Sequence, residues 1–258
     1  MDASPDPVGT RVDYGVEAFQ FGDLTVPAGE GPFPVVVFIH GGFWRNSFGL
    51  DLAEAQAADA VRAGYATWNV EYRRVGDPGG GYPGTLLDVA AAVDHLATLA
   101  DTYPIDLDRV AVVGHSAGGH LALWVGQREA LSAGAPGAGP AVVPGLVIGQ
   151  APVADLSNNL DLGGGAVEQF MGVLPTDDPA AYDIADPARL PPVLVPQLIV
   201  QGADDRIVPP ERAAAYADLV GDADRLSVKV FDGDHFSVID PNHESWLAVL
   251  DRLAEEFA

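Results

Sequence analysis

The chain has 258 residues, with 37 acidic and 13 basic side chains, and a formal net charge of −24. Its 48% hydrophobic and 19% charged residues are typical of a globular protein with a substantial core. The acidic excess disfavours nucleic acids and anionic membranes as partners, because both are bound by clustered lysines and arginines. The absence of cysteine excludes disulfides, thiol nucleophiles and cysteine-based metal sites.

No apolar run approaches the ~18 residues of a membrane span. The first residues lack a basic segment followed by an apolar one, so no signal peptide is predicted and we expect a cytoplasmic protein. A periplasmic or secreted location is the alternative if a leader has been removed. The acidity itself indicates either simple solubility or adaptation to high salt.

From residue 12 onward the chain alternates strand-like and helix-like segments, after a polar lead-in over 1–11. In chain order we expect strands at 12–21, 23–26 and 35–39, a helix at 50–63, a strand at 66–70, a helix at 85–99, a strand at 110–113, a helix at 117–127, strands at 146–148 and 193–200, a helix at 209–220, a strand at 226–231 and a helix at 244–257. This alternation predicts one α/β domain over 1–258, with a mostly parallel central sheet flanked by helices.

The segment 151–192 interrupts the alternation. It contains three consecutive glycines at 163–165, several prolines and few periodic apolar residues. We expect a cap-like insertion over the carboxyl ends of the strands, where α/β proteins bind ligands. A long surface loop is the alternative.

The segment Gly-His-Ser-Ala-Gly at 114–118 matches the G-x-S-x-G nucleophile elbow. An apolar strand pattern enters it and a helix pattern leaves it, which is the context that this motif requires. A sharp strand-to-helix turn exposes the serine hydroxyl, and small neighbours let the backbone pass close by. Ser116 is therefore the predicted nucleophile.

The segment His-Gly-Gly-Phe-Trp at 40–44 follows the predicted strand at 35–39. Acyl transfer needs backbone N–H donors at the developing oxyanion, and the loss of one donor costs about 3 kcal/mol. We assign this role to the N–H groups of Gly42, Phe43 and Ala117. His40 is expected to be a hydrogen-bonded core residue that orients the loop.

Two further strand ends supply a candidate acid and a candidate base. Asp204 and Asp205 follow the strand predicted to end at residue 200, and a carboxylate there can hold the Nδ1–H of a catalytic histidine. His235 follows the strand at 226–231 and is the predicted general base, with His243 as the alternative. The order Ser, Asp, His along the chain is that of one hydrolase architecture.

At these residues the sequence resembles the α/β-hydrolase superfamily over nearly its whole length. The segment 40–44 is similar to the oxyanion loop of kynurenine-formamidase-like and related esterase families. Their nucleophile segment resembles 114–122, and their histidine loop resembles 234–236. The superfamily pattern H-G-x-x-D-x-x-V-P, aligned on Gly202 and Pro209, implies that the acid is Asp205 rather than Asp204. Gln201 replaces the histidine of that pattern.

The sequence lacks the motifs that other catalytic chemistries require. A P-loop or a serine–lysine enzyme needs a suitably placed lysine, and the single lysine, Lys229, lies in a strand pattern. No H-E-x-x-H zinc motif occurs, so we expect neither a metal nor another cofactor.

The resemblance implies a serine hydrolase for a small ester or amide, aromatic substrates included, and the net charge of −24 favours a neutral substrate over a highly anionic one. Carboxylesterase activity is the favoured prediction. Arylformamidase activity on an N-formylkynurenine-type amide is one alternative, and a non-catalytic small-molecule-binding protein is the other. Trp44, Tyr72 and His115 are the predicted substrate-contacting residues, although Trp44 equally suits packing around the oxyanion loop. The oligomeric state stays open, with a homodimer included.

Overall fold

The computed structural model describes residues 8–190 and 192–258, so most of the predicted lead-in, 1–7, and one residue of the predicted insertion lie outside the described residues. The strands are β1 (Val8–Asp13), β2 (Phe21–Val26), β3 (Phe33–Ile39), β4 (Ala66–Val70), β5 (Ile105–His115), β6 (Leu146–Gln150), β7 (Gln197–Gly202) and β8 (Leu226–Phe231). The helices are α1 (Glu54–Arg62), α2 (Gly84–Asp94), α3 (Leu96–Leu99), α4 (Ala117–Val125), α5 (Ala166–Met171), α6 (Pro179–Ala185), α7 (Pro210–Val220) and α8 (Glu244–Glu256).

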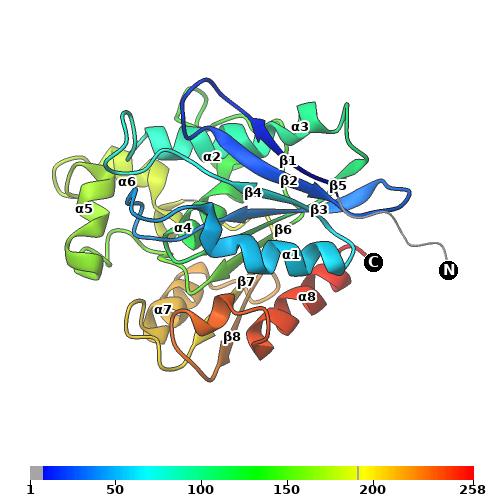
Figure 1. Ribbon diagram of the computed structural model, residues 1–258. Helices are drawn as coiled ribbons and strands as arrows, with labels where there is room; N and C mark the ends of the chain where they lie inside the picture. Colours follow the sequence, from blue (N-terminus) through cyan, green and yellow to red (C-terminus); the bar gives the residue numbers. More distant parts are fainter. Residues whose placement is uncertain (1–7, 191) are drawn as a thin grey trace.

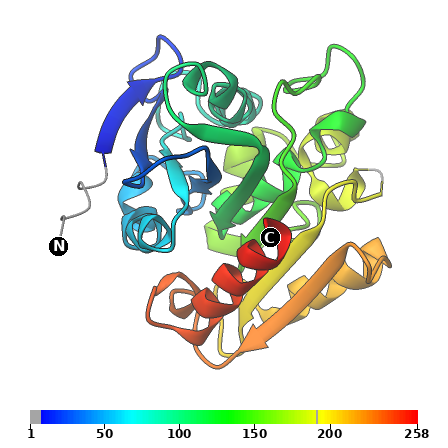
Figure 2. The ribbon, with the colours of Figure 1, turned by 90° about the vertical axis from the view of Figure 1, so that its right-hand side faces the viewer.

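The strands form one eight-stranded sheet in the order β1-β2-β4-β3-β5-β6-β7-β8. β2 pairs antiparallel with β1 and β4, whereas the neighbours from β4 to β8 are all parallel. Helices α1 and α8 cover one face of the sheet, and α2, α3, α4 and α7 cover the other (Figures 1 and 2). The sheet and its two helical layers confirm the predicted fold class.

The central strands are apolar because both of their faces are covered. All residues of β4, β6 and β7 are buried, whereas in the edge strand β8 only Leu226 is buried and the other positions are exposed or half-buried. This difference is expected, because both faces of a central strand are covered by helices, whereas an edge strand keeps contact with water. No helix within the described residues is long and apolar enough to cross a membrane.

Several predicted boundaries differ from the structure. The strand predicted at 12–21 is wrong, because β1 ends at Asp13 and a turn closed by the bond from Tyr14 N to Gln20 O (2.9 Å) leads into β2. Gly22 lies inside β2, where a Cβ atom would come within 2.6 Å of the Trp68 ring. The helix predicted at 85–99 divides at His95, and β7 begins at Gln197 rather than at 193.

The segment 151–192 contains α5 and α6, which lie beside the carboxyl ends of the parallel strands (Figure 1). Its base is held by Asp186, a fully buried carboxylate that accepts bonds from the backbone N–H groups of Leu156 and Ser157 (2.9 Å each). Burial nevertheless raises the pKa of Asp186 above its ordinary value. These bonds close the segment on itself, and two side chains of α4 attach it to the rest of the fold: His120 Nε2 bonds to the Ala185 carbonyl oxygen (2.8 Å) and Trp124 Nε1 to that of Ile184 (2.9 Å).

Candidate active site

Ser116 occupies the turn between β5 and α4. Its backbone angles, φ 54° and ψ −116°, are unusual for a residue with a side chain, and such strain is typical of functional positions. Close approach of the backbone requires glycine on both sides, since a Cβ on Gly118 would lie 2.1 Å from Ile39 O and one on Gly114 would lie 2.1 Å from Gly118 O. The local sequence therefore permits the sharp turn that the motif predicts.

The side chains of Asp205 and His235 are hydrogen-bonded to each other. His235 Nδ1 lies 2.7 Å from Asp205 Oδ2, and both residues are buried. Because a carboxylate only accepts hydrogen bonds, the proton of this bond is on Nδ1, which leaves Nε2 free to accept one. Asp204, the alternative acid, is exposed and its side chain makes no hydrogen bond to His235 within the described residues.

Asp205 is held as a charged acceptor by the turn that follows it. Its Oδ1 accepts the backbone N–H groups of Ile207 (2.8 Å) and Val208 (2.9 Å), and its Oδ2 accepts Gln201 Nε2 (3.0 Å). Burial opposes ionisation, but the bond and charge of His235 and these backbone bonds outweigh it and lower the pKa of Asp205. Gln201 thus replaces the expected histidine with a donor that fixes the acid.

His115 supports the histidine loop from the strand side. Its Nε2 donates to the carbonyl oxygen of His235 (2.9 Å), and the two rings lie 4.6 Å apart. Burial and the nearby charge of His235 lower the pKa of His115 to about 3, so its ring is neutral near pH 7. His115 also lines the cavity at Ser116, as expected for a residue near substrate.

Three cavities meet around Ser116. The smallest, which we call the serine cavity, has a volume of about 30 Å³ and is lined by Gly42, Phe43, Phe48, Leu52, His115, Ser116, Ile207, His235 and Phe236. The arginine cavity, about 370 Å³, is lined by Phe43, Asp161, Leu162, Gly163, Arg206, Ile207, Pro209 and Arg212. The histidine cavity, about 570 Å³, is lined by Asp204, Arg206, Ile207, Asp234, His235 and Phe236. Ile207 lines all three, so they are neighbours, and we refer to them together as the cleft.

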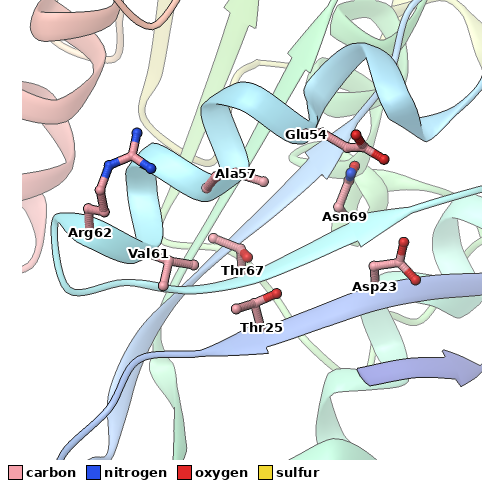
Figure 3. A pocket seen from close by; sticks show the side chains of 9 residues that line it. Asp23, Thr25, Glu54, Ala57, Val61, Arg62, Thr67 and Asn69 are labelled. Atoms are coloured by element: carbon pink, nitrogen blue, oxygen red, sulfur yellow. The ribbon is translucent and has the colours of Figure 1, made fainter. Parts of the chain in front are cut away.

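A separate cavity of about 300 Å³ lies between α1 and the strands β2 and β4 (Figure 3). Its polar lining includes Asp23, Glu54 and Asn69, and its apolar side is formed by Ala57 and Val61. None of the predicted site residues belongs to it. The chemistry that the sequence predicts therefore lies in the cleft at Ser116 instead.

The loop after β3 presents backbone donors to the serine cavity. Gly42 and Phe43 both line it and have positive φ angles of 114° and 56°. Ala117 is the first residue of α4, where an N–H group has no partner inside the helix. Within the described residues, the N–H groups of Gly42, Phe43 and Ala117 donate to no protein acceptor. These three groups are available to a ligand atom beside Ser116.

The loop 40–44, which the sequence predicts to be the oxyanion loop, is anchored by a buried ion-pair network that no sequence motif indicated. His40 Nε2 lies 2.9 Å from Glu71 Oε1, and Arg74 Nη1 lies 3.0 Å from the same oxygen. Burial opposes the charge of Glu71, but the bond from His40 and the charges of His40 and Arg74 lower its pKa overall. His40 is therefore the hydrogen-bonded core residue that was expected. Its partner Glu71 could have been suspected as a lone acidic residue directly after the apolar strand at 66–70.

Trp44 and Tyr72 lie behind the oxyanion loop, and this corrects the expectation that both contact substrate. Trp44 is 1% exposed and stacks on Phe170 of α5 at 4.8 Å, which confirms its alternative role in packing. Tyr72 is fully buried, stacks on His40 at 4.4 Å and donates its hydroxyl to the His40 carbonyl oxygen (2.7 Å). These two aromatic rings therefore pack in the core behind the loop and not on the side where substrate was expected.

The remaining candidates fall elsewhere. His243, the alternative base, caps α8 and bonds to Ser245 Oγ (2.8 Å) without lining any of the three cavities. Ile207 and Arg206, which do line them, were missed because a turn next to an acidic pair gives no pattern by which to select them. The structure thus brings Ser116, His115, His235, Gly42 and Phe43 to one cavity, with Asp205 directly behind His235.

Comparison with known proteins agrees with this geometry. The sequence matches the BD-FAE family over residues 23–219. Esterase LipI of Mycobacterium tuberculosis is 31% identical over 137 residues, which are 53% of this chain and 39% of that protein. Esterase LipC of the same organism is 30% identical over 95 residues, 37% of this chain and 23% of that protein. The chain therefore spans well under half the length of these curated relatives.

Solved structures share the whole architecture. A truncated carbohydrate esterase from gut microbiota has a TM-score of 0.83 at 18% identity, covering 97% of each chain. Esterase B from Lactobacillus rhamnosis has a TM-score of 0.79 at 24% identity, covering 98% of this chain and 88% of its own. At such low identity these likenesses show the fold, which is that of the α/β-hydrolases.

Proposed function

Because the chain belongs to the BD-FAE family within the α/β-hydrolase superfamily, we propose that it is a serine carboxylesterase acting on short acyl esters. One observation supports this most strongly. Ser116 on its strained turn and His235, bonded to Asp205 at 2.7 Å, line the same small cavity as the donor loop. The esterase names of LipI and LipC point to the same reaction class.

In the proposed mechanism, Ser116 Oγ attacks the ester carbonyl carbon while His235 Nε2 takes its proton. The N–H groups of Gly42, Phe43 and Ala117 donate to the resulting oxyanion. Collapse of the intermediate breaks the bond to the alcohol oxygen, which takes the proton from His235 and leaves an acyl-enzyme. Water, deprotonated by His235, then releases the acid and restores Ser116. No Ser116–His235 hydrogen bond is present within the described residues, and such bonds often tighten only when substrate binds.

The size of the serine cavity supports a short acyl group. About 30 Å³ corresponds to roughly one water molecule. A methyl group matches this volume, whereas a butyryl chain exceeds it. We therefore expect kcat/KM to fall from p-nitrophenyl acetate to the butyrate and again to the octanoate.

The arylformamidase alternative has less support. A formyl group would also fit the serine cavity, but of the three rings expected to accept an aromatic amide, only Phe43 lines that cavity, and Trp44 and Tyr72 are buried behind the loop. A higher kcat/KM for N-formylkynurenine than for p-nitrophenyl acetate would favour this alternative. The cytoplasmic location and the homodimer stay predictions from the sequence.

The test is hydrolysis of p-nitrophenyl acetate by the wild type and by Ser116→Ala. We expect the variant to lose turnover and labelling by a fluorophosphonate while keeping its melting temperature. Ser227→Ala, on the exposed side of β8, is the matched control and should retain both. Wild-type-like activity of Ser116→Ala would refute the mechanism, and a folded wild type without labelling or turnover would favour a non-catalytic binding protein.

A further inference from the structure

Arg206 lies at the junction of the cleft. Its side chain lines both the arginine cavity and the histidine cavity, and the next residue, Ile207, forms a wall of the serine cavity. The backbone on either side is fixed, because Asp205 accepts the N–H groups of Ile207 and Val208. The guanidinium is thus attached to a rigid turn beside the predicted catalytic residues.

Arg206 also differs from the other arginines in having no partner. Nine arginines form ion pairs with carboxylates, and Arg45 and Arg225 donate to backbone carbonyl oxygens. Within residues 8–190 and 192–258, Arg206 makes neither an ion pair nor a hydrogen bond. In a chain with 37 acidic residues, an unpaired guanidinium beside the site is available to bind an anion from outside the protein.

The arginine cavity has the composition that an organic anion needs. Arg212 lines it together with Arg206, donates Nη1 to the Asn158 carbonyl oxygen and contacts both oxygens of Asp161 (3.3 and 3.4 Å), so two guanidinium groups and one carboxylate line the cavity. Phe43, Leu162 and Pro209 supply an apolar wall. The histidine cavity, in contrast, is lined by two carboxylates, Asp204 and Asp234, which repel a bound anion.

We propose that Arg206 is a specificity-determining residue that binds a carboxylate on the larger portion of the ester, seated in the arginine cavity. The inference rests on the proposed esterase function, which assigns the small acyl group to the serine cavity and leaves the larger portion outside it. Arginine suits this role because its planar fork binds a carboxylate through two parallel hydrogen bonds. The proposal revises the expectation, drawn from the charge of −24, of a neutral substrate.

The net charge of the molecule does not prevent such binding. Screening limits the field of exposed charges to about 8–10 Å at physiological salt, so the nearest groups determine the local potential. Two cations, Arg206 and Arg212, and one carboxylate, Asp161, line the arginine cavity itself, which leaves one net positive charge there. A carboxylate placed there interacts with this net positive charge more strongly than with distant acidic side chains.

The test compares 4-acetoxybenzoate with 4-acetoxybenzamide, which share the acetyl group and the ring and differ in the carboxylate. We expect Arg206→Gln to lower the ratio of kcat/KM for the benzoate to kcat/KM for the benzamide by about tenfold, with the value for the benzamide unaffected. Arg206→Lys should recover part of this ratio. Arg252→Gln, on α8 and outside all three cavities, makes the same change of net charge and should leave the ratio unchanged. Binding of 4-hydroxybenzoate against 4-hydroxybenzamide, followed by calorimetry, gives a second measurement that needs no turnover.

An unchanged ratio in Arg206→Gln, or an equal loss in Arg252→Gln, would overturn the inference. A wild type that hydrolyses neither ester but binds 4-hydroxybenzoate through Arg206 would contradict the esterase function and keep the anion site. Hydrolysis of both esters with no dependence on Arg206 would leave the esterase function standing and refute the site.

Discussion

The substitution Glu71→Gln tests whether a buried ion pair holds the oxyanion loop. Glu71 Oε1 accepts bonds from His40 Nε2 (2.9 Å) and Tyr72 N (3.0 Å) and pairs with Arg74 (3.0 Å), while Oε2 accepts Leu50 N (3.3 Å). Glutamine has nearly the same shape, so the change removes the charge and one acceptor without opening a cavity. Any effect therefore reports on the electrostatic contacts.

The expected loss of stability follows from these contacts. Hydrogen bonds to charged groups contribute about 1.5–3 kcal/mol and neutral ones about 0.5–1.5 kcal/mol, so the bonds with His40 and Arg74 each weaken by about 1 kcal/mol. The amide NH₂ then faces the Leu50 N–H, which costs about 1 kcal/mol more. A total of about 3 kcal/mol lowers the melting temperature by roughly 6–12 °C for a chain of this size.

Activity should fall as well, because the backbone of Gly42 and Phe43 depends on this anchor. Complete loss of one oxyanion donor costs about 10²–10³ in kcat, so a displaced loop should lose at least about tenfold, with KM little changed. Thermal unfolding and p-nitrophenyl acetate kinetics at pH 7 measure both effects. Glu255→Gln, at an exposed position of α8, is the control.

The pH dependence gives an independent check. Because the pKa of Glu71 is lowered in the folded protein, its contribution is fully present above the ordinary glutamate pKa of about 4.3 and is lost as the pH falls through the folded-state value. The difference in melting temperature between wild type and Glu71→Gln should therefore narrow below about pH 4. Equal melting temperatures and equal kcat at pH 7 would refute the reasoning.

Two further predictions concern Asp205 and His115. Asp205→Asn should lower kcat by about 10⁴-fold at neutral pH, because an amide does not stabilise the His235 imidazolium. The neighbouring Asp204→Asn should retain activity. If the two variants gave the same steady-state kinetics, Asp205 would not be the catalytic acid. His115 stays neutral in the fold down to about pH 3, while its unfolded-state imidazole takes up a proton below about pH 6.5, so the protein should lose stability as the pH falls between these values. Thermal unfolding of His115→Gln should show a weaker acid dependence, and an identical slope would contradict the assigned burial.

Short motifs and strand patterns in the sequence were enough to predict the α/β fold and the residues that meet in the cleft. The reason is local, since the glycines at 114 and 118 make room for the sharp turn at Ser116, and apolar runs such as β3 suit a sheet buried on both sides. Asp205, selected through the superfamily pattern, and His235 follow strands β7 and β8, and the structure pairs these two strands as neighbours in the sheet.

What the sequence did not contain is the packing around these residues. Trp44 and Tyr72 have the chemistry to contact a substrate or to fill a core, and only the positions of Phe170 and His40 decide between the two roles. No sequence motif marks Glu71, Ile207 or Arg206. The role of Glu71 depends on partners distant in the chain, and that of Arg206 depends on the absence of a partner within the described residues. Tertiary structure alone decides which side of the loop an aromatic ring occupies and which charge stays unpaired, since both depend on what the rest of the chain brings alongside.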